Sequence, residues 1–253
     1  MSVIIEIDNL TNDIFNNLSM KIDNNKIYSI SGSNNSGKTT LIRTLSTNDN
    51  DYIKVCNYKV KEFKLDEYNK IVQTVIPLEF LQVENTLEDE FIYYNNDEEL
   101  INFLKKGLSL NRIIDKNYNN LSNQDKIIYQ IAVSLVKKPL ILLLDNIGLY
   151  FTNKELIDLY DFFKEFINTY GLTILSTTIN LEESLLSDYL YIINNGNVAL
   201  EGLPLEVIKK DNIINKLGLS IPFMVDLSVK LCDYELIDEI ILDKERMVEK
   251  LWK

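Results

Sequence analysis

The first 45 residues alternate between apolar and polar positions in a way that predicts three short strands followed by one helix. Residues 3–7, 19–22 and 26–31 have the two-residue period of strands. Residues 39–45 instead carry apolar side chains at helical spacing. The beginning of the chain therefore predicts a strand-rich segment that leads, through one connection, into a helix.

The middle of the chain predicts a parallel sheet. Residues 139–145 form a continuous apolar run that ends in Asp145, which is the pattern of a strand buried on both faces. Residues 156–170 have helical periodicity, Gly171 can end that helix, and residues 172–178 form the next predicted strand. This β-α-β order is typical of an α/β fold.

Two further segments complete the expected organisation. Asn195-Gly196 lies between apolar runs at 189–193 and 198–200 and predicts a tight hairpin. Residues 72–137 are helical and acidic, with an amphipathic helix over 98–107, and predict an inserted helical subdomain. The predicted division is 1–71 for the N-terminal part of a core, 72–137 for the helical subdomain, 138–203 for the C-terminal part of the core, and 204–253 for a helical C-terminal extension.

The connection between the third strand and its helix reads Gly-Ser-Asn-Asn-Ser-Gly-Lys-Thr-Thr over residues 32–40, a complete G-x-x-x-x-G-K-T phosphate-binding loop. Gly32 and Gly37 allow backbone N–H groups to wrap a phosphate at a helix N-terminus. Lys38 would reach the β- and γ-phosphates, and the Thr39 hydroxyl would ligate Mg²⁺. The alternative, a Gly/Asn-rich turn before an ordinary helix, leaves the Lys-Thr pair unexplained. The predicted nucleotide-binding residues are Gly32, Ser33, Asn34, Asn35, Ser36, Gly37, Lys38, Thr39 and Thr40.

Composition narrows the possible chemistry. The 253 residues are 46% apolar, enough for a substantial core. The chain has no histidine, which excludes imidazole bases and His metal ligands. Its two isolated cysteines, Cys56 and Cys232, argue against a disulfide framework or a zinc site. A net charge of −12 argues against a nucleic-acid-binding surface.

The same sequence predicts a cytosolic chain that can dock on a membrane protein. No stretch approaches the roughly 18 to 20 apolar residues needed to span a bilayer. Glu6 and Asp8 stand where a signal peptide would be basic and then apolar.

Two other segments carry candidate chemistry. Asp145, at the carboxyl end of a buried strand, can hold Mg²⁺ beside the phosphate loop; the alternative is an Asp that caps a helix. Leu121-Ser122 precedes a helix predicted over 126–137, and taken alone Ser122 and Asp125 form a helix-capping box.

Taken in order, these segments resemble the ATP-binding cassette of ABC transporters. The resemblance rests on residues 32–40, Leu121-Ser122, residues 132–145, the 173–178 strand and the 194–202 hairpin, and it covers nearly the whole chain. It implies a P-loop NTPase fold, an ABC-type cassette with a RecA-like mixed sheet and a helical subdomain, and binding of ATP with Mg²⁺. In that family two cassettes pack head to tail, so Leu121 and Ser122 would contact the nucleotide held by the partner cassette.

The tail resembles the C-terminal extension of energy-coupling factor (ECF) ATPase subunits, through residues 218–231 and 247–252. This resemblance implies a second ABC ATPase subunit as partner, as a heterodimer, together with a transmembrane coupling protein and a substrate-binding membrane protein. It also implies a peripheral position on the cytoplasmic face of the cell membrane. The alternative is an amphipathic helical pair that closes a core or a dimer.

The chain departs from the family where catalysis occurs. Asn146 stands where the family has its catalytic Glu, and Ile179 stands where it has its switch His. Asn cannot accept a proton from water at neutral pH, and loss of a general base typically costs about 10²- to 10⁴-fold in rate. In the composite-site segment, Asn123, Gln124 and Asp125 replace two glycines and a glutamine. We therefore expect little or no hydrolysis in this chain's own site.

Two smaller departures accompany these. Thr152 stands where the dimer-contact Asp is expected, and Phe15 is the nearest stand-in for the family's adenine-stacking Tyr.

The sequence thus predicts the ATP-binding subunit of an ECF-type importer, which pairs with a second cassette to power uptake of a vitamin or other small micronutrient. The alternative is a catalytically inactive, nucleotide-gated structural subunit of another ABC transporter. A soluble cassette acting on ribosomes or DNA is disfavoured by the acidic charge and by the single cassette.

Overall fold

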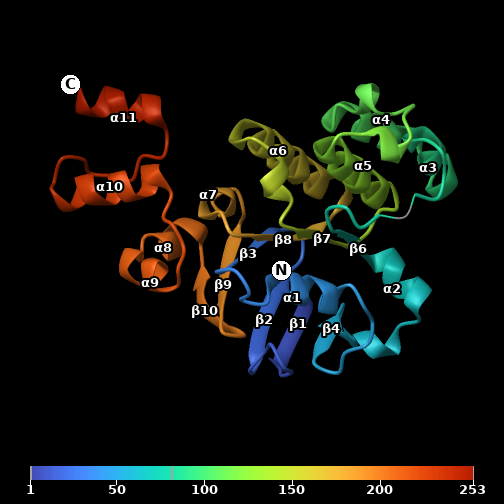
Figure 1. Cartoon of the computed structure of the whole chain (residues 1–253), viewed down its shortest axis with the longest axis horizontal. Coiled ribbons are helices and arrows are strands. Elements are labelled where there is room, and N and C mark those ends of the chain that lie inside the picture. Colours follow the sequence, from blue (N-terminus) through green and yellow to red (C-terminus); the bar gives the residue numbers. More distant parts are fainter. Residues whose placement is uncertain (1, 81, 253) are drawn as a thin grey trace.

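A computed structural model describes residues 2–80 and 82–252. Its centre is a six-stranded sheet in the order β10-β9-β3-β8-β7-β6, in which only the β9–β10 pair is antiparallel (Figure 1). The strands are β3 (Ile27–Ser31), β6 (Val72–Val75), β7 (Ile141–Asp145), β8 (Thr173–Thr178), β9 (Tyr189–Asn194) and β10 (Asn197–Gly202). The predicted β-α-β order and the Asn195-Gly196 hairpin are confirmed.

A second sheet is antiparallel and has the order β2-β1-β4-β5. Its strands are β1 (Val3–Leu10), β2 (Leu18–Asp23), β4 (Ile53–Val55) and β5 (Tyr58–Lys59). In Figure 1 it lies below the six-stranded sheet, with α1 (Lys38–Leu45) between the two. One apolar core joins these parts and includes Ile5, Ile22, Leu41 and Ile42.

The buried strands divide their side chains between two cores because successive residues of a strand point to opposite faces. In β7, Ile141 and Leu143 belong to the core shared with the second sheet, whereas Leu142 and Leu144 belong to a core on the other face. That other core is built largely by α5 (Asn123–Val136) and α6 (Asn153–Tyr170). All five residues of β7 are buried, as the continuous apolar run predicts.

The helical segment begins later than the sequence predicts. Val72–Val75 lies within the range assigned to the helical subdomain, but it forms β6 and pairs with β7 at the edge of the large sheet. Helical structure follows in α3 (Leu87–Tyr94) and α4 (Glu98–Gly107), after which α5 returns the chain to the core. A four-residue strand is too short to reveal its period in the sequence.

Smaller elements connect these parts. They are η1 (Val60–Glu62), α2 (Leu65–Ile71), η2 (Leu110–Arg112), η3 (Tyr118–Asn120), η4 (Ile147–Tyr150) and α7 (Leu181–Ser184).

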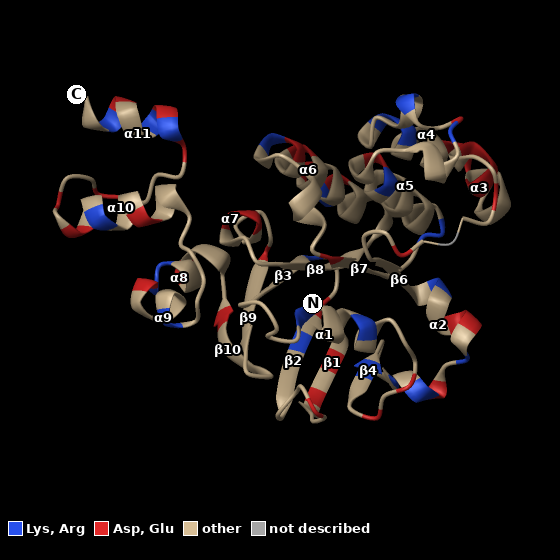
Figure 2. Cartoon of the chain, in the orientation of Figure 1, with Lys and Arg blue, Asp and Glu red and all other residues tan. Residues whose placement is uncertain are grey.

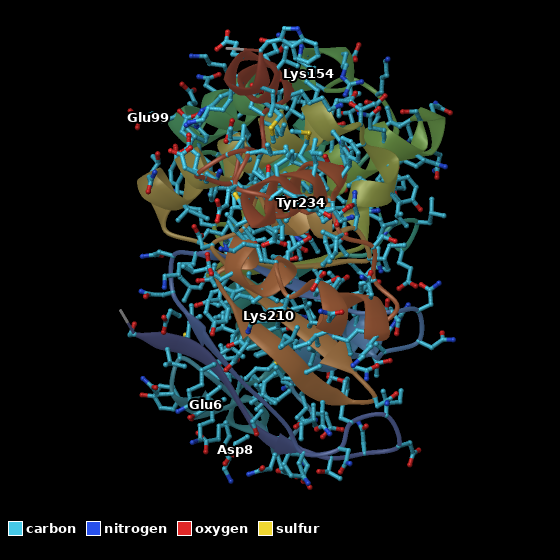
Figure 3. The ribbon with its side chains drawn as sticks, turned by 90° about the vertical axis from the view of Figure 1, so that its left-hand side faces the viewer. Glu6, Asp8, Glu99, Lys154, Lys210 and Tyr234 are labelled. Carbon is cyan, nitrogen blue, oxygen red and sulfur yellow. The ribbon has the colours of Figure 1, made fainter. Side chains whose placement is uncertain are left out.

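Residues 204–252 form four helices beside the β9–β10 edge: α8 (Pro204–Ile208), α9 (Asp211–Lys216), α10 (Phe223–Asp233) and α11 (Lys244–Leu251). Figure 1 shows α10 and α11 projecting away from the sheets. They enclose a small core around Ile237, Ile241 and Met247. Tyr234 and Trp252 directly follow these two helices and are exposed; Tyr234 faces the viewer in Figure 3, and Trp252 is 83% exposed.

Acidic and basic residues are interspersed along the helices (Figure 2). Within residues 2–80 and 82–252, we find no helix that combines the length and the apolar character required to cross a bilayer.

Candidate nucleotide-binding site

The loop between β3 and α1 has the backbone that its two glycines predict. Gly37 has a φ of 102°, a conformation that L side chains rarely adopt, and it immediately precedes the first residue of α1. Gly32 has no room for a side chain, because a Cβ there would lie 2.3 Å from the Ile193 carbonyl oxygen. The loop therefore has a left-handed residue at Gly37 and packs closely against β9 at Gly32, and its amides lead into a helix N-terminus.

Lys38 is held inside this loop. Its ammonium donates hydrogen bonds to the carbonyl oxygens of Gly32 (2.8 Å) and Ser33 (2.9 Å) and approaches the Ser36 hydroxyl at 3.4 Å. Lys38 is only 6% exposed, and this burial lowers its pKa, while the nearby Asp145 carboxylate acts in the opposite direction. The single cation of the loop is thus fixed at its centre.

Asp145 ends β7 beside the first turn of α1 and accepts several hydrogen bonds at one oxygen. Its Oδ1 accepts from the hydroxyls of Thr39 (3.1 Å) and Thr177 (2.6 Å) and from the Asn146 side-chain amide (3.2 Å). Asp145 is 5% exposed. The structure thus joins Thr39 to Asp145, the two residues that the sequence predicts as magnesium ligands.

Thr177 was missed by sequence reasoning. It pairs with Asp145 in the β7–β8 register, and its hydroxyl also accepts the Asn146 backbone N–H at 3.1 Å. The available signal was the polar Ser-Thr-Thr end of an otherwise apolar strand, at the edge of the sheet where the phosphate loop begins.

Asn146 and Ile179 follow the carboxyl ends of adjacent strands and face the same cavity. The cavity measures about 460 Å³ and is lined by residues 34–40 together with Ile14, Asn146, Leu149 and Ile179. Asn146 has a φ of 48°, a left-handed conformation that Asn adopts more readily than most residues. Ile179 is 41% exposed. The side chains nearest the phosphate loop on this side are therefore an amide and an alkyl group, and neither can act as a base at neutral pH.

The prediction that Phe15 takes the place of the adenine-stacking Tyr is wrong. Phe15 is 1% exposed and packs beneath Gly37, where a Cβ would lie 2.9 Å from its ring. Its neighbour Ile14, which the sequence analysis did not single out, lines the cavity instead and is 45% exposed. Within residues 11–17 Phe15 alone is buried, so packing against the core, rather than residue type, decides which side chain faces the cavity.

Leu121 and Ser122 do not line this cavity. Ser122 caps α5 by accepting the Asp125 backbone N–H at 3.2 Å, which is one of the two hydrogen bonds of the capping box expected from the sequence. The helix nevertheless begins at Asn123, three residues before the predicted start. Asn123, Gln124 and Asp125 therefore form its first turn.

Two residues of that turn that differ from the family's motif, Gln124 and Asp125, interact with other residues of the chain. The Asp125 carboxylate pairs with the Arg112 guanidinium at 2.5 Å. The Gln124 side chain is the main contributor to a lowered pKa of Glu155, followed by the Thr152 backbone N–H. Thr152 and Glu155 form a reciprocal capping box at the start of α6, so Thr152 has a structural role in this chain.

A buried carboxylate lies close to the cavity wall. Glu183, on α7, is 3% exposed, and its Oε1 accepts hydrogen bonds from the hydroxyls of Tyr160 (3.0 Å) and Ser176 (3.4 Å). Burial raises the pKa of Glu183. Gly148, in η4, leaves room for this carboxylate, because a Cβ there would lie 2.1 Å from Oε2. Glu183 thus links α6, β8 and the turn that carries Leu149.

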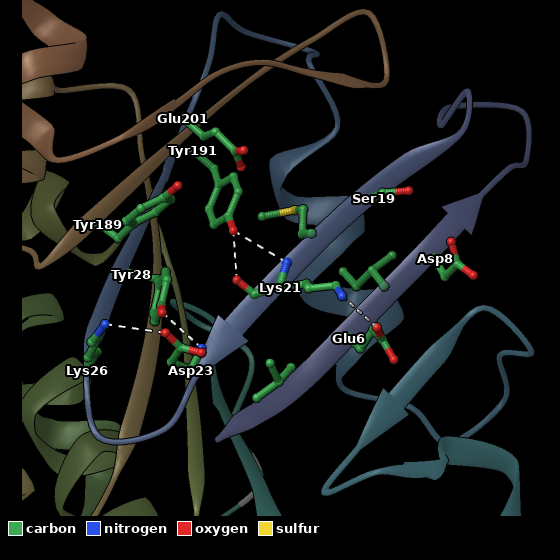
Figure 4. Close-up of a pocket in the computed structure, with 13 residues that line it drawn as sticks. Glu6, Asp8, Ser19, Lys21, Asp23, Lys26, Tyr28, Tyr189, Tyr191 and Glu201 are labelled. Carbon is green, nitrogen blue, oxygen red and sulfur yellow. Dashed lines mark hydrogen bonds and ion pairs between the residues drawn. The ribbon is translucent and has the colours of Figure 1, made fainter. Parts of the chain in front are cut away.

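A larger cavity, of about 630 Å³, lies between the two sheets near the start of β3 and is a different site (Figure 4). Tyr28, Tyr189 and Tyr191 project into it. The Tyr191 hydroxyl donates to the Lys21 carbonyl oxygen at 2.7 Å, and the Tyr28 hydroxyl accepts the Asp23 N–H at 2.9 Å. These polar groups bond the two sheets to each other.

The fold and the phosphate loop define a P-loop nucleotide-binding protein of the α/β class. A family model described as ABC transporter matches residues 15–147, just over half of the chain. The chain belongs to this family.

Curated relatives resemble this chain along most of its length, and a solved structure has the same fold. The chain is 28% identical over 270 residues to energy-coupling factor transporter ATP-binding protein EcfA1 of Streptococcus thermophilus strain CNRZ 1066, covering 98% of each chain. It is 27% identical over 224 residues to EcfA2 of Clostridium perfringens strain 13, covering 82% of this chain and 79% of the relative. CbiO1 of Clostridium perfringens, part of the ABC transporter complex cbiONQ, superposes with a TM-score of 0.73 at 20% identity, covering 90% of this chain and 99% of that chain. The predicted fold class and the resemblance to ECF ATP-binding subunits are confirmed.

Proposed function

We propose that this chain is the ATP-binding subunit of an ECF-type importer, with little or no hydrolysis in its own site. One observation carries the proposal: a single cavity combines the phosphate loop, Lys38 and Thr39 with Asn146 and Ile179 at its far wall. The residues that would bind the phosphates and the two side chains that cannot act as a base would therefore face the same nucleotide.

Residues 32–40 bind the triphosphate in this proposal. The loop amides and the buried Lys38 ammonium supply positive charge to the phosphates. Thr39 and Asp145 fit Mg²⁺, because both offer hard oxygen atoms and already lie 3.1 Å apart. When bound, Mg²⁺ neutralises phosphate charge; the chain's own part is to orient Asp145 through Thr177 and Asn146.

Hydrolysis in this site is slow because, among the described residues that line the cavity, no side chain can take a proton from water at neutral pH. The Asn146 amide donates to Asp145 and has no basic atom at neutral pH. Ile179 offers only alkyl groups. The nucleotide then acts through binding energy, which favours closure against a second cassette.

The proposed partner is a second ABC ATPase subunit, in a heterodimer. Leu121 and Ser122 would contact the partner's nucleotide, which is consistent with their absence from the lining of this chain's own cavity. The C-terminal extension supplies a further surface for dimerisation, since Phe223, Tyr234 and Trp252 are 70%, 77% and 83% exposed.

A transmembrane coupling protein and a substrate-binding membrane protein complete the proposed complex, which holds this chain on the cytoplasmic face of the cell membrane. The helical segment offers a suitable surface. A groove of about 470 Å³ runs between α3 and α4, and the adjacent Ile92 and Tyr93 are 59% and 60% exposed. We propose that the complex takes up a vitamin or other small micronutrient.

The test is purification from mild detergent, followed by identification of the companions and measurement of MgATP hydrolysis by the chain, the companion cassette and the mixture. We expect a second cassette and an integral membrane protein to copurify, and turnover to depend on the companion. Brisk turnover by the isolated chain, or a lack of affinity for MgATP, would contradict the proposal.

The second candidate is an inactive, nucleotide-gated structural subunit of another ABC transporter. The segment after Ser122 favours it, because Asn123, Gln124 and Asp125 replace the two glycines and the glutamine of the segment expected to face a partner's phosphate. Identification of the companions separates the candidates: a coupling protein with a substrate-binding membrane protein supports the first, and the membrane subunits of another ABC transporter support the second.

A further inference from the structure

Two separate segments form the far wall of the nucleotide cavity, and their side chains are open to solvent. Asn146 and Leu149 belong to the turn that follows β7, and Ile179 follows β8. Leu149 and Ile179 are 67% and 41% exposed, so their own packing does little to fix them. The position of this wall therefore depends on how the two segments are held from behind.

Glu183, on α7, is the group at which these segments meet. Its Oε1 accepts the Ser176 hydroxyl, near the end of β8, at 3.4 Å. The same oxygen accepts the Tyr160 hydroxyl of α6 at 3.0 Å. Its carboxyl carbon lies against η4, since a Cβ on Gly148 would be 2.7 Å from it. Glu183 does not line the cavity, so it acts on the wall only through the segments that it contacts.

The short helix α7 holds Glu183 firmly in this place. Asn180 caps the helix through its side-chain oxygen. The Ser184 hydroxyl lies 2.8 Å from the Ser29 hydroxyl of β3, and both residues are buried. Leu181 packs into the core shared with the C-terminal helices. Figure 1 shows α7 on the face of the six-stranded sheet opposite to α1, and the residues on both sides of Glu183 are anchored there.

The carboxyl group of Glu183 has hydrogen-bond partners but no counter-ion. Among the described residues, the side chains that act on it are the uncharged hydroxyls of Thr178, Tyr160 and Ser176. A buried carboxyl without a cation is a poor source of net stability, and an apolar side chain would fill the same space at lower cost. Directional hydrogen bonds to three elements instead favour one arrangement of those elements.

The far wall lies nearest to the terminal phosphate of a triphosphate. The amides of a phosphate loop hold the α- and β-phosphates, and its Lys reaches toward the γ-phosphate. The Thr39–Asp145 pair, which fits Mg²⁺, lies at the carboxyl end of β7, directly before Asn146. A diphosphate ends before this wall. A change in the position of the wall should therefore affect MgATP more than MgADP.

We propose that Glu183 is a positioning residue for the terminal phosphate: its carboxyl group joins η4 to β8 and thereby holds Leu149 and Ile179 at the far wall. The proposal rests on the proposed function, because it concerns how the same site distinguishes a triphosphate from a diphosphate. Without the carboxyl group, the two segments must be ordered when the nucleotide binds, and that free energy is subtracted from the affinity.

The experiment is isothermal titration calorimetry of the full chain with MgATP and with MgADP. Glu183→Ala should weaken MgATP binding about three- to tenfold and change MgADP binding less than about twofold. Tyr160→Phe removes one hydroxyl and keeps the ring, so it should weaken MgATP binding in the same direction by at least about twofold.

Two further variants separate positioning from general stability. Glu183→Gln keeps the size of the side chain and an oxygen acceptor, so both affinities should stay within about twofold of wild type. Tyr118→Phe is the matched control for Tyr160→Phe. Its hydroxyl is buried and accepts the Gln130 side-chain amide at 2.6 Å, away from the cavity, so both affinities should be unchanged.

Thermal unfolding shows whether each variant is folded at the temperature of the titration. If Glu183→Ala does not fold, Tyr160→Phe decides the question. Equal weakening of MgATP and MgADP, unchanged affinities in the folded variants, or a loss in Glu183→Gln as large as in Glu183→Ala would overturn the role of Glu183 and leave the proposed function standing. A wild-type chain that binds neither nucleotide would overturn both.

Discussion

The hydroxyl of Thr39 donates a hydrogen bond to the carboxylate of Asp145 at 3.1 Å, although 106 residues separate them in the sequence. Thr39 lies in the first turn of α1, which follows β3, and Asp145 ends β7. β8 lies between those two strands in the sheet, and its Thr177 hydroxyl bonds the same carboxylate oxygen. Adjacent parallel strands thus bring the candidate metal ligands together at one edge of the sheet.

Replacement of Lys38 should remove most of the affinity for nucleotide. Lys38→Ala deletes the buried ammonium at the centre of the phosphate loop. Hydrogen bonds to charged groups contribute about 1.5–3 kcal/mol, so the dissociation constant for MgATP should rise at least about tenfold. Isothermal titration calorimetry measures it, and Lys154→Ala, an exposed position on α6, is the control. Equal affinities for both variants would contradict the proposed role.

Restoring the two missing groups should create hydrolytic activity. Asn146→Glu with Ile179→His places a general base and an imidazole at the far wall of the cavity. Turnover of MgATP in this chain's own site, measured with a companion cassette whose own phosphate-loop Lys is replaced, should rise about 10²-fold or more, the usual contribution of a positioned base.

Asn146→Gln is the matched control for this gain. It imposes the same strain on the left-handed backbone at φ 48° but supplies no base. Steady-state phosphate release distinguishes the variants. If both accelerate turnover equally, basicity at position 146 does not limit the reaction.

Glu183 should make the folded state less stable as pH rises. Burial raises its folded-state pKa above the ordinary value of 4.5. Between these two values the folded chain binds more protons than the unfolded chain, so the free energy of unfolding contributed by this group falls with increasing pH. Below the pKa of the unfolded state the carboxyl is protonated in both the folded and the unfolded chain, so burying it carries no cost of burying a charge.

Glu183→Gln removes that titration. Urea denaturation from pH 4 to 8 should show a smaller loss of stability with pH for the variant than for wild type, while Glu165→Gln, on the exposed face of α6, should follow wild type. A variant whose profile runs parallel to wild type would show that Glu183 is ionised at its ordinary pKa.

Gly148 should be intolerant of a side chain because of Glu183. Gly148→Ala places a Cβ 2.1 Å from Glu183 Oε2 and should cost about 1–3 kcal/mol of stability. Combined with Glu183→Ala, which empties that space, the loss should be smaller than the sum of the two single losses. Thermal unfolding of the four variants in the cycle measures the coupling; additive losses would show that the two residues do not meet.

Local signals predicted most of the elements and the loop. The helix over 98–107 begins and ends where α4 does, and the strand-loop-helix order around Gly32 and Lys38 is present. These features depend on short-range periodicity and on backbone requirements of single residues. Phe15 and β6 were misjudged because their burial and pairing depend on residues far away in sequence: Phe15 packs under Gly37, and Val72–Val75 pairs with β7.

The sequence by itself determined that this chain carries a phosphate loop and a carboxylate at the end of an apolar run, and it predicted that Asn146 and Ile179 stand where the family has a base and an imidazole. Only the tertiary structure decided that the loop, the amide and the alkyl group line one cavity, that the Thr177 hydroxyl donates to Asp145, and that Ile14 rather than Phe15 faces that cavity. The physical reason is that residue type and spacing fix chemistry and local conformation. Which side chain of a short connection is exposed, and which distant hydroxyl meets a carboxylate, follow from strand order and packing against the core.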